Sequence, residues 1–336
     1  MSKVGNVAKS GRINWIDTVK GVAILFVLLQ HCGFSDKTMK IALFPYFENL
    51  AIPIFMTISG FTFTLSLRKA MKGNFGVIKY YFDFRNLKKK VIRILPAYTL
   101  VFILEIVLDF LKNGNFSFKN LLLYFVGGLN FPGSYYIPVL VELVIIFPFL
   151  VILHQKLPKG LDLLLVLLVQ VAYEVFIFYA GIPEWFTRLL VIRYLLFVVL
   201  GIYLFESKDK EIPLPVNLTL MILGLAYITA IGYFNCQPKV IFATWTNTAL
   251  PTAFFVFPVL YFIQKKFGKS SRVLKFNLIG KASFHIYLVQ MMFFGFFWKR
   301  FDAVIMCCIG IPVSCVLGIL FYKAEPILIN KFRRTI

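Results

Sequence analysis

Charged residues are scarce in this chain. Asp, Glu, Lys and Arg make up only 15% of its 336 residues, whereas a soluble domain usually carries about a quarter. A surface of normal charge density facing water is therefore excluded. Apolar residues instead make up 60% of the chain and aromatic residues 18%, a composition typical of a protein whose solvent is the lipid bilayer.

The residues that build metal and redox sites are also few. The five cysteines include no CxxC pair, and the three histidines show neither HxxxH nor HExxH spacing, so we predict no metal site. Cys32 and Cys236 fall on the same predicted side of the membrane, where a disulfide is one alternative and soft apolar packing the favoured one. GxSxG, P-loop and GxGxxG motifs are absent from the sequence, which leaves serine hydrolases, ATPases and Rossmann folds without support.

Acidic residues are too few to balance the basic ones, and the formal net charge is +21. A nucleic-acid-binding protein concentrates such charge on one face of a soluble fold. Here the basic residues occupy short segments between long apolar runs, which is the pattern of cytoplasmic loops. Nucleic acid is therefore not expected as a partner, and the lipid bilayer is.

Apolar runs long enough to cross a bilayer, roughly 20 residues each, occur throughout the chain. They predict an all-α integral membrane protein, a bundle of about ten transmembrane helices that forms one domain over residues 1–336. A shorter apolar run at 121–130 ends before Pro132-Gly133 and is expected to be re-entrant or interfacial. The predicted spans are 15–33, 46–67, 92–111, 137–154, 161–180, 186–205, 215–234, 242–264, 282–298 and 303–322.

The placement of lysine and arginine predicts the orientation. With both termini in the cytoplasm, roughly three of every four basic residues lie at the inner side, as the positive-inside rule requires. The N-terminal region is similar to a signal peptide, but His31 and Cys32 stand where a small-residue cleavage site is expected. We therefore interpret it as a retained first helix of a multi-pass cell-membrane protein.

Ionisable side chains cost at least roughly 2.5–3.5 kcal/mol at the centre of a membrane helix, so each is a functional candidate. In the first span, Asp17, Lys20 and His31 share one helical face, with His31 roughly 21 Å along the axis from Asp17. A neutral imidazole accepts a proton from a hydroxyl near neutral pH, which makes His31 the predicted base. The alternatives are a packed, hydrogen-bonded His31 and an Asp17–Lys20 pair that snorkels to the interface.

A basic stretch at 85–96 leads into the third span. Lys90 and Arg93 are three residues apart, so they share a helical face where the membrane begins, and Arg85 precedes them. This geometry suits a phosphate-bearing ligand at the inner surface. Ordinary anchoring to anionic lipid is the alternative.

Further candidates lie on other spans. Tyr135, Tyr136 and Glu142 are expected near the outer face, where phenols and a carboxylate bind sugar hydroxyls. A structural ion pair between Glu142 and Arg193 is an equally good interpretation. The remaining intramembrane carboxylates are Glu105, Asp109 and Glu174.

Six segments together resemble, in order, the acyltransferase-3 family of membrane enzymes that acylate cell-surface and secreted glycans. The similarity extends over essentially the whole chain. The segments are the opening helix from Ile16 to His31, the "FxxxSGF"-like element with Ser59, the "RxxRilPxY"-like element from Lys90 to Tyr98, the aromatic region from Tyr135 to Pro148, the "lGxxSyxiYLxH"-like element from Ile279, and the "ExP"-like Glu325-Pro326.

This resemblance implies an enzyme that transfers an acyl group, with acetyl expected, from cytoplasmic acyl-CoA to a hydroxyl of a glycan or lipid-linked sugar. Acyl-CoA would be a co-substrate, acetyl-CoA being expected, and no tightly bound cofactor is implied. His31 would be the essential histidine, and Lys90, Arg93 and Arg85 would bind acyl-CoA. The supporting residues would be Asp17, Lys20, Ser59, Tyr136, Glu142 and Tyr287.

Three positions depart from the family pattern. Lys20 replaces the usual Arg, and Lys90 replaces the first Arg of the basic pair, which keeps the charge but loses the bidentate fork. Gln290 stands where a second His is often found, and the soluble SGNH domain of some relatives is absent. The rival hypotheses are a transporter or exporter of a polysaccharide precursor and, more weakly, a structural scaffold, which would leave the intramembrane His31 unexplained.

Overall fold

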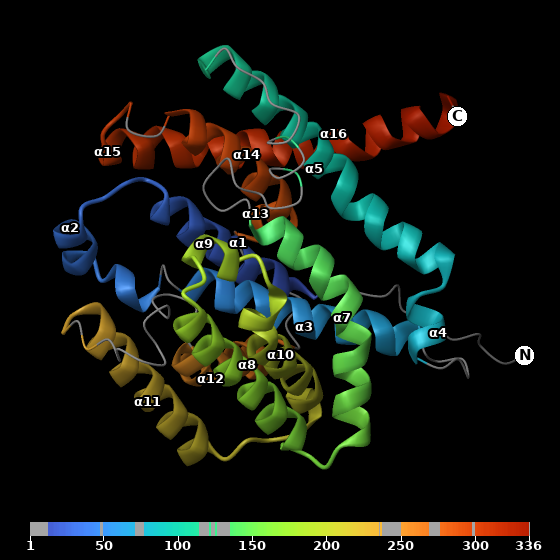
Figure 1. Ribbon diagram of the computed structural model, residues 1–336, viewed down its shortest axis with the longest axis vertical. Coiled ribbons are helices and arrows are strands. Elements are labelled where there is room, and N and C mark those ends of the chain that lie inside the picture. Colours follow the sequence, from blue (N-terminus) through green and yellow to red (C-terminus); the bar gives the residue numbers. More distant parts are fainter. Residues whose placement is uncertain are drawn as a thin grey trace, which may run out of the picture.

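The computed structural model describes residues 13–47, 50–70, 77–113, 121, 125, 135–234, 236, 250–268, 276–297 and 300–335. All regular secondary structure within these residues is helical (Figure 1), which confirms the predicted all-α class. Five stretches are both long and apolar enough to cross a membrane: Phe44–Arg68, Tyr136–Lys156, Leu161–Ala180, Leu214–Gly232 and Ala303–Ile327. The chain is therefore a multi-pass membrane protein.

Every predicted span overlaps a helix of the described structure. The main helices are α1 (Asn14–Gln30), α3 (Ala51–Ala70), α5 (Phe84–Asn113), α7 (Tyr136–Lys156), α8 (Leu161–Ala180), α10 (Leu195–Glu206), α11 (Leu214–Gly232), α12 (Ala253–Phe267), α14 (Ser283–Phe297) and α16 (Ile311–Thr335). Short helices join them: α2 (Asp36–Ile41), η1 (Phe44–Tyr46), α4 (Val77–Tyr81), α9 (Glu184–Thr187), η3 (Val191–Tyr194), α13 (Asn277–Lys281) and α15 (Ala303–Ile305).

Several boundaries differ from the prediction. The sixth span was predicted from residue 186, but its main helix begins at Leu195, because the preceding residues form α9, a turn and η3. The third begins earlier, at Phe84, so the basic stretch is helical and Pro96 lies inside α5. In the eighth, the described helix begins at Ala253, and most of the preceding predicted segment lies outside the described residues.

The predicted re-entrant run at 121–130 lies outside the described residues apart from Leu121 and Phe125. The Phe125 carbonyl accepts a hydrogen bond from the Tyr98 hydroxyl at 2.8 Å. All five cysteines are free thiols, Cys32 buried and Cys236 exposed. The alternative of a Cys32–Cys236 disulfide is therefore not realised.

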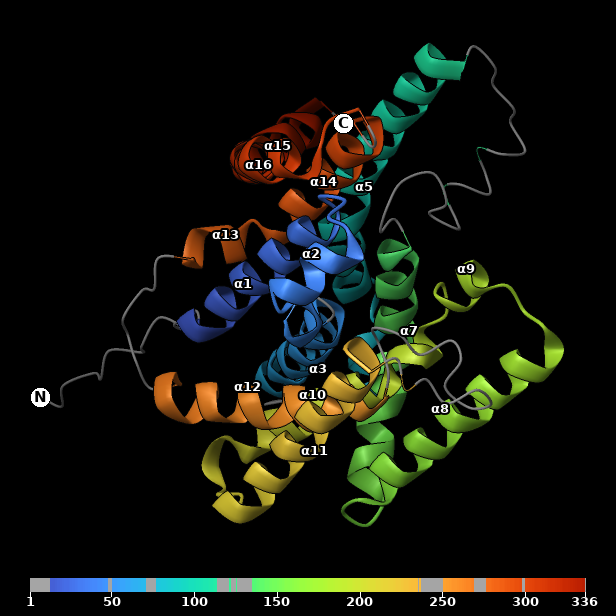
Figure 2. The same cartoon turned by 90° about the vertical axis from the view of Figure 1, so that its left-hand side faces the viewer.

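Helices α1 and α3 lie at the centre of the bundle. Figure 2 shows them between a layer that contains α14 and α16 and a layer that contains α10, α11 and α12. Three glycines permit the closest crossings: a Cβ on Gly280 would lie 1.5 Å from the Asp17 carbonyl oxygen, one on Gly60 would lie 2.1 Å from the Val198 carbonyl oxygen, and one on Gly201 would lie 2.1 Å from the Thr57 carbonyl oxygen. Small residues at these positions let the backbones touch, as in many membrane helix pairs.

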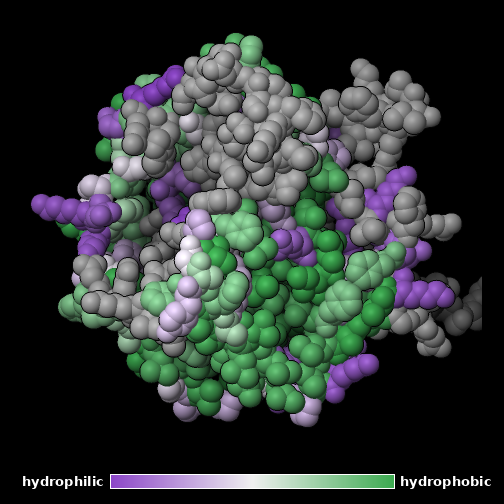
Figure 3. Space-filling model, viewed as in Figure 1, coloured by the Kyte–Doolittle hydropathy of each residue, from purple (hydrophilic) through white to green (hydrophobic). Residues whose placement is uncertain are grey.

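The outer surface carries the apolar side chains that face lipid. On α8, Leu168 and Phe176 are 54% and 61% exposed, and on α11, Ile222 is 62% exposed. Figure 3 shows a broad apolar area over α7, α8 and α11. Large apolar surfaces of this kind are not stable in water, which agrees with the membrane assignment.

Candidate active site

His31 lies at the C-terminal cap of α1, next to α14. Its Nδ1 is 2.8 Å from the carbonyl oxygen of Val27, and its ring centroid is 6.4 Å from that of Phe294. Because a carbonyl can only accept, Nδ1 carries the hydrogen, and the neutral ring keeps its lone pair on Nε2. Nε2 has no hydrogen-bond partner among the described residues, so it is available as a base.

The other two histidines are paired with carboxylates. His285 Nε2 is 2.8 Å from Glu325 Oε2, so two of the family-like segments, on α14 and α16, meet there. His154 lies 2.7 Å from Asp162 and 3.2 Å from Glu206. Among the described residues, His31 is thus the histidine without a carboxylate partner, which is what a base that reacts with an incoming hydroxyl requires.

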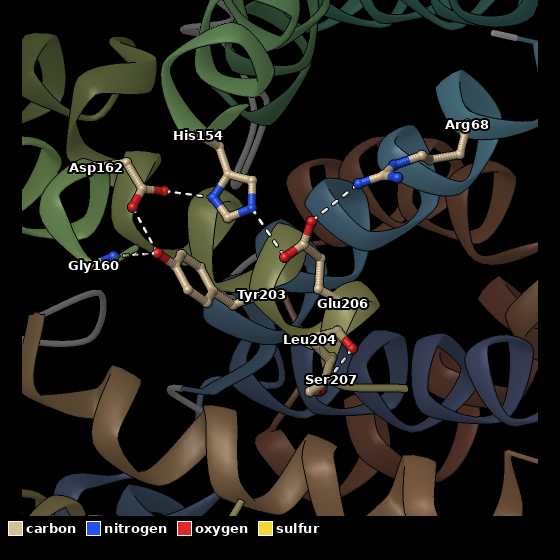
Figure 4. A network of polar contacts seen from close by, with 8 residues as sticks. All are labelled: Arg68, His154, Gly160, Asp162, Tyr203, Leu204, Glu206 and Ser207. Carbon is tan, nitrogen blue, oxygen red and sulfur yellow. Dashed lines mark hydrogen bonds and ion pairs between the residues drawn. The ribbon is translucent and has the colours of Figure 1, made fainter. Parts of the chain in front are cut away.

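The His154 contacts belong to a larger network that the sequence analysis did not find. Figure 4 shows the imidazole between the Asp162 and Glu206 carboxylates, with Tyr203 and Arg68 at the two ends. Tyr203 donates to Asp162 at 2.6 Å, and Arg68 pairs with Glu206 at 3.1 Å. The network joins α3, α7, α8 and α10, so it stabilises their packing.

Three predicted supporting residues from separate helices come together inside the bundle. The side chain of Ser59 on α3 lies close enough to Tyr136 on α7 to interact with its hydroxyl, and the ring centroids of Tyr136 and Tyr287 on α14 lie 5.2 Å apart. Glu105 on α5 is close enough to interact electrostatically with Tyr287. Its carboxylate is buried, and Oε1 has no hydrogen-bond partner among the described residues. We call Ser59, Glu105, Tyr136 and Tyr287 the central cluster.

Gln290 lies on α14 between Tyr287 of the central cluster and Phe294, the neighbour of His31. Tyr287, Gln290 and Phe294 are spaced three and four residues apart, so they share one face of α14. Gln290 is fully buried, and neither atom of its amide has a hydrogen-bond partner among the described residues. A buried amide without partners is costly, so this position suits a polar ligand atom between the cluster and the imidazole.

Tyr136 lies at the start of α7 and packs against α14. The Tyr136 ring contacts the Tyr287 ring. Tyr287 lies about 10 Å along α14 from Phe294, which is seven residues further on and is the neighbour of His31. Tyr136 is also buried, because its ring packs against Phe55 of α3 and Tyr287 of α14. The proposed sugar-binding phenol is therefore an interior residue.

Glu142 has a structural partner. Its Oε2 accepts the backbone N–H of Val191 at 2.7 Å, so it caps the 3-10 turn η3. Arg193, in the same turn, is buried and donates to the Thr187 hydroxyl at 3.3 Å. This arrangement differs from the expected cluster of Glu142 with Tyr136 at a sugar.

Lys90 lies near the start of α5 with its ammonium over the Tyr81 ring of α4, a cation–π contact. Lys90 Nζ and the Tyr81 hydroxyl are both buried and without hydrogen-bond partners among the described residues. Burial lowers the pKa of Lys90 to about 8. An anionic ligand would therefore stabilise the charged form of this buried lysine.

The remaining predicted residues are only partly placed. Asp17 is buried and Lys20 half-buried on α1, and both interact with neighbouring groups. The backbones of Arg85 and Arg93 lie in α5, whereas their side chains, like that of Asp109, lie outside the described part of the structure. The structure therefore brings together Ser59, Tyr136 and Tyr287, but it does not show the basic trio as one site.

Comparison with known proteins gives one finding. No curated protein and no solved structure matches this chain. The model of the acyltransferase-3 family, described as an acyltransferase domain, matches residues 13–323, nearly the whole chain. The match includes α1 with His31, the central cluster and Lys90, and it identifies the protein as an enzyme. This chain therefore belongs to the acyltransferase-3 family of membrane acyltransferases.

Proposed function

We propose that this acyltransferase transfers an acetyl group from cytoplasmic acetyl-CoA to a hydroxyl of a cell-surface polysaccharide or its lipid-linked precursor. The observation that carries the proposal is the unpaired Nε2 of His31, next to a face of α14 that bears the unpartnered Gln290 amide. A buried polar group without a protein partner calls for an explanation, and a bound ligand that completes its hydrogen bonds is one. The enzyme would lie in the cell membrane with both termini in the cytoplasm.

Lys90 is the best-described residue for the donor end. Its buried, unpartnered ammonium lies at the N-terminal part of α5, on the side that the orientation places in the cytoplasm. The phosphates of acetyl-CoA would pair with Lys90, and with Arg93 and Arg85 on the same helix. The acyl thioester would then extend into the bundle along α14, which packs against α5.

The acceptor hydroxyl would be activated by His31. Nε2 takes the hydroxyl proton while the oxygen attacks the thioester carbonyl, forming a C–O bond and a tetrahedral oxyanion. Collapse of the oxyanion breaks the C–S bond, and the imidazolium returns the proton to the leaving CoA thiolate. The Gln290 amide, and the Tyr136 and Tyr287 hydroxyls, would orient the reacting groups, and the packed bundle would exclude the water that hydrolyses thioesters.

A labelled-transfer experiment tests the function. Membrane vesicles that contain the protein receive acetyl-CoA labelled in the acetyl group, and the glycan fraction is analysed by mass spectrometry. We expect a labelled ester on the sugar that vesicles without the chain do not form. Modification only with another acyl-CoA would overturn the acetyl assignment, and movement of unmodified glycan without any acyl-CoA would favour the transporter hypothesis.

A further inference from the structure

A crevice of about 340 Å³ opens between α1, α3 and α12, within the usual range of ligand sites. Nearly all of its lining is apolar, and the lining residues include no acidic side chain. Along α1 it reaches from Trp15 to Phe26, about 16 Å at 1.5 Å per residue. Its other walls include Ile54 of α3 and Val259 and Ile263 of α12. These dimensions suit one extended hydrocarbon chain.

The crevice lies on the opposite side of α1 from the candidate active site. Trp15, Val22 and Phe26 line it, and with 3.6 residues per turn they share one helical face. Ile24 and His31, which are spaced seven apart, share the face that is turned about half a circle away. The acyl group of a donor bound near His31 would therefore not enter this crevice.

Positive charge lies at one end of the crevice. Phe267, the last residue of α12, lines it together with Trp15, near the start of α1. The Lys266 ammonium lies 5.5 Å from the centroid of the Phe267 ring, and Lys266 is exposed. The Lys265 ammonium instead donates to the Lys208 carbonyl at 3.5 Å and lies near the Tyr261 ring, and neither Lys265 nor Lys266 lines the crevice. An apolar slot with a cationic end is complementary to a lipid with an anionic headgroup.

We propose that the crevice binds one acyl chain of an anionic phospholipid, with the headgroup phosphate beside Lys266. The cationic end marks the leaflet in which α1 begins, away from the His31 end of that helix. A lipid-linked sugar acceptor would need its headgroup at the His31 end, so it fits less well. The bound chain would support the face of α1 opposite His31 and so hold that helix in place.

Fluorescence quenching in vesicles tests this site without any measurement of catalysis. Trp15 lines the crevice and is only 3% exposed, so a brominated acyl chain quenches it efficiently only from within the crevice. The full chain is reconstituted with brominated phosphatidylglycerol or brominated phosphatidylcholine in increasing mole fraction. The signal of Trp15 is the difference between the wild-type protein and Trp15→Phe, since the chain has four tryptophans.

We expect phosphatidylglycerol to quench Trp15 at about fivefold lower mole fraction than phosphatidylcholine, because basic residues near the bilayer surface attract anionic lipid. The variant Lys266→Gln should remove this preference but leave quenching by both lipids. Equal quenching by the two lipids in the wild-type protein would overturn the headgroup assignment.

A pair of matched variants tests occupancy of the crevice. Val259→Phe adds a ring to its wall, and Val216→Phe makes the same change on the exposed surface of α11. We expect Val259→Phe to reduce Trp15 quenching several-fold and Val216→Phe to leave it unchanged, with both proteins monodisperse and equally resistant to heat. Unchanged quenching in a folded Val259→Phe protein would contradict the proposal, and Val22→Phe provides a second test if Val259→Phe does not fold.

Discussion

Two polar regions lie inside this membrane protein, and they differ in how well their groups are paired. In the His154 network, the imidazole lies between Asp162 and Glu206, and the Tyr203 hydroxyl donates a hydrogen bond to the Asp162 carboxylate. On α14, in contrast, the Gln290 amide is buried without a hydrogen-bond partner among the described residues, and the nearby His31 at the end of α1 uses Nδ1 in its described hydrogen bond, which leaves Nε2 for a substrate. In the first region the imidazole and both carboxylates have protein partners, whereas in the second the Gln290 amide has hydrogen-bonding capacity left for a ligand.

This difference distinguishes structural polar groups from reactive ones. A buried, fully bonded network holds helices together, and breaking it costs stability. A buried group without a partner reduces stability, and a substrate that supplies the missing contact is one reason for it to persist. We therefore expect substitutions along α14 and at His31 to affect catalysis, and substitutions in the His154 network to affect the free energy of unfolding.

The largest expected effect is that of His31→Ala. Loss of the general base should lower acetyl transfer by about 10²–10⁴-fold, measured as labelled acetyl on glycan in membranes with equal amounts of protein. His154→Ala is the matched control, since it removes an imidazole from the paired region, and it should retain transfer when folded. Full activity of His31→Ala would exclude the proposed mechanism.

Gln290→Leu should separate activity from stability. Loss of the amide should lower kcat about tenfold, the value of one good hydrogen bond to the substrate. The fold itself should become no less stable, because a buried amide without a partner is replaced by an apolar side chain.

Gln170 is the control for this change, since it is equally buried but bonded: its Nε2 donates to the Arg193 carbonyl at 2.7 Å. We expect Gln170→Leu to lower the melting temperature in detergent and to leave kcat nearly unchanged. If both variants lose stability alike, Gln290 is a structural residue and the contrast between the regions fails.

Lys90 gives a prediction on pH. Burial lowers its pKa to about 8, so the side chain is charged below that pH and neutral above it. Because the charged form binds phosphate, kcat/KM for acetyl-CoA should fall as the pH rises through about 8, by up to about tenfold. Lys90→Arg should remove this fall, since arginine stays charged. A decline of the same size in Lys90→Arg would assign the titration to another group.

The smallest expected effect on transfer is in the paired region. Asp162→Asn weakens the contacts to His154 and Tyr203, and interhelical contacts in membranes contribute about 1–2 kcal/mol at most. We expect a lower melting temperature in detergent but less than a twofold change in kcat at a temperature where the protein is folded. A large loss of kcat with unchanged stability would place this network in the catalytic machinery.

The helical class and the approximate positions of the spans could be predicted because a bilayer demands long apolar runs, which are visible in sequence. The sixth span was predicted too long, because hydropathy does not detect that Glu142 caps η3 at Val191. The contacts of Tyr136 with Phe55 and Tyr287 could not be predicted, since they depend on how α3, α7 and α14 pack. The His154 network was also missed, although Asp162 follows His154 across a short turn.

The sequence by itself determined that this is a helical membrane protein, that it resembles the acyltransferase-3 family, and that Asp17, Lys20 and His31 share a face of the first helix. These properties follow from composition, order and the periodicity of a single helix. The tertiary structure decided which polar groups are satisfied: His154 and His285 are paired with carboxylates from other helices, whereas Gln290 is buried without a partner. Pairing between distant segments depends on how helices cross, and that geometry is fixed by packing.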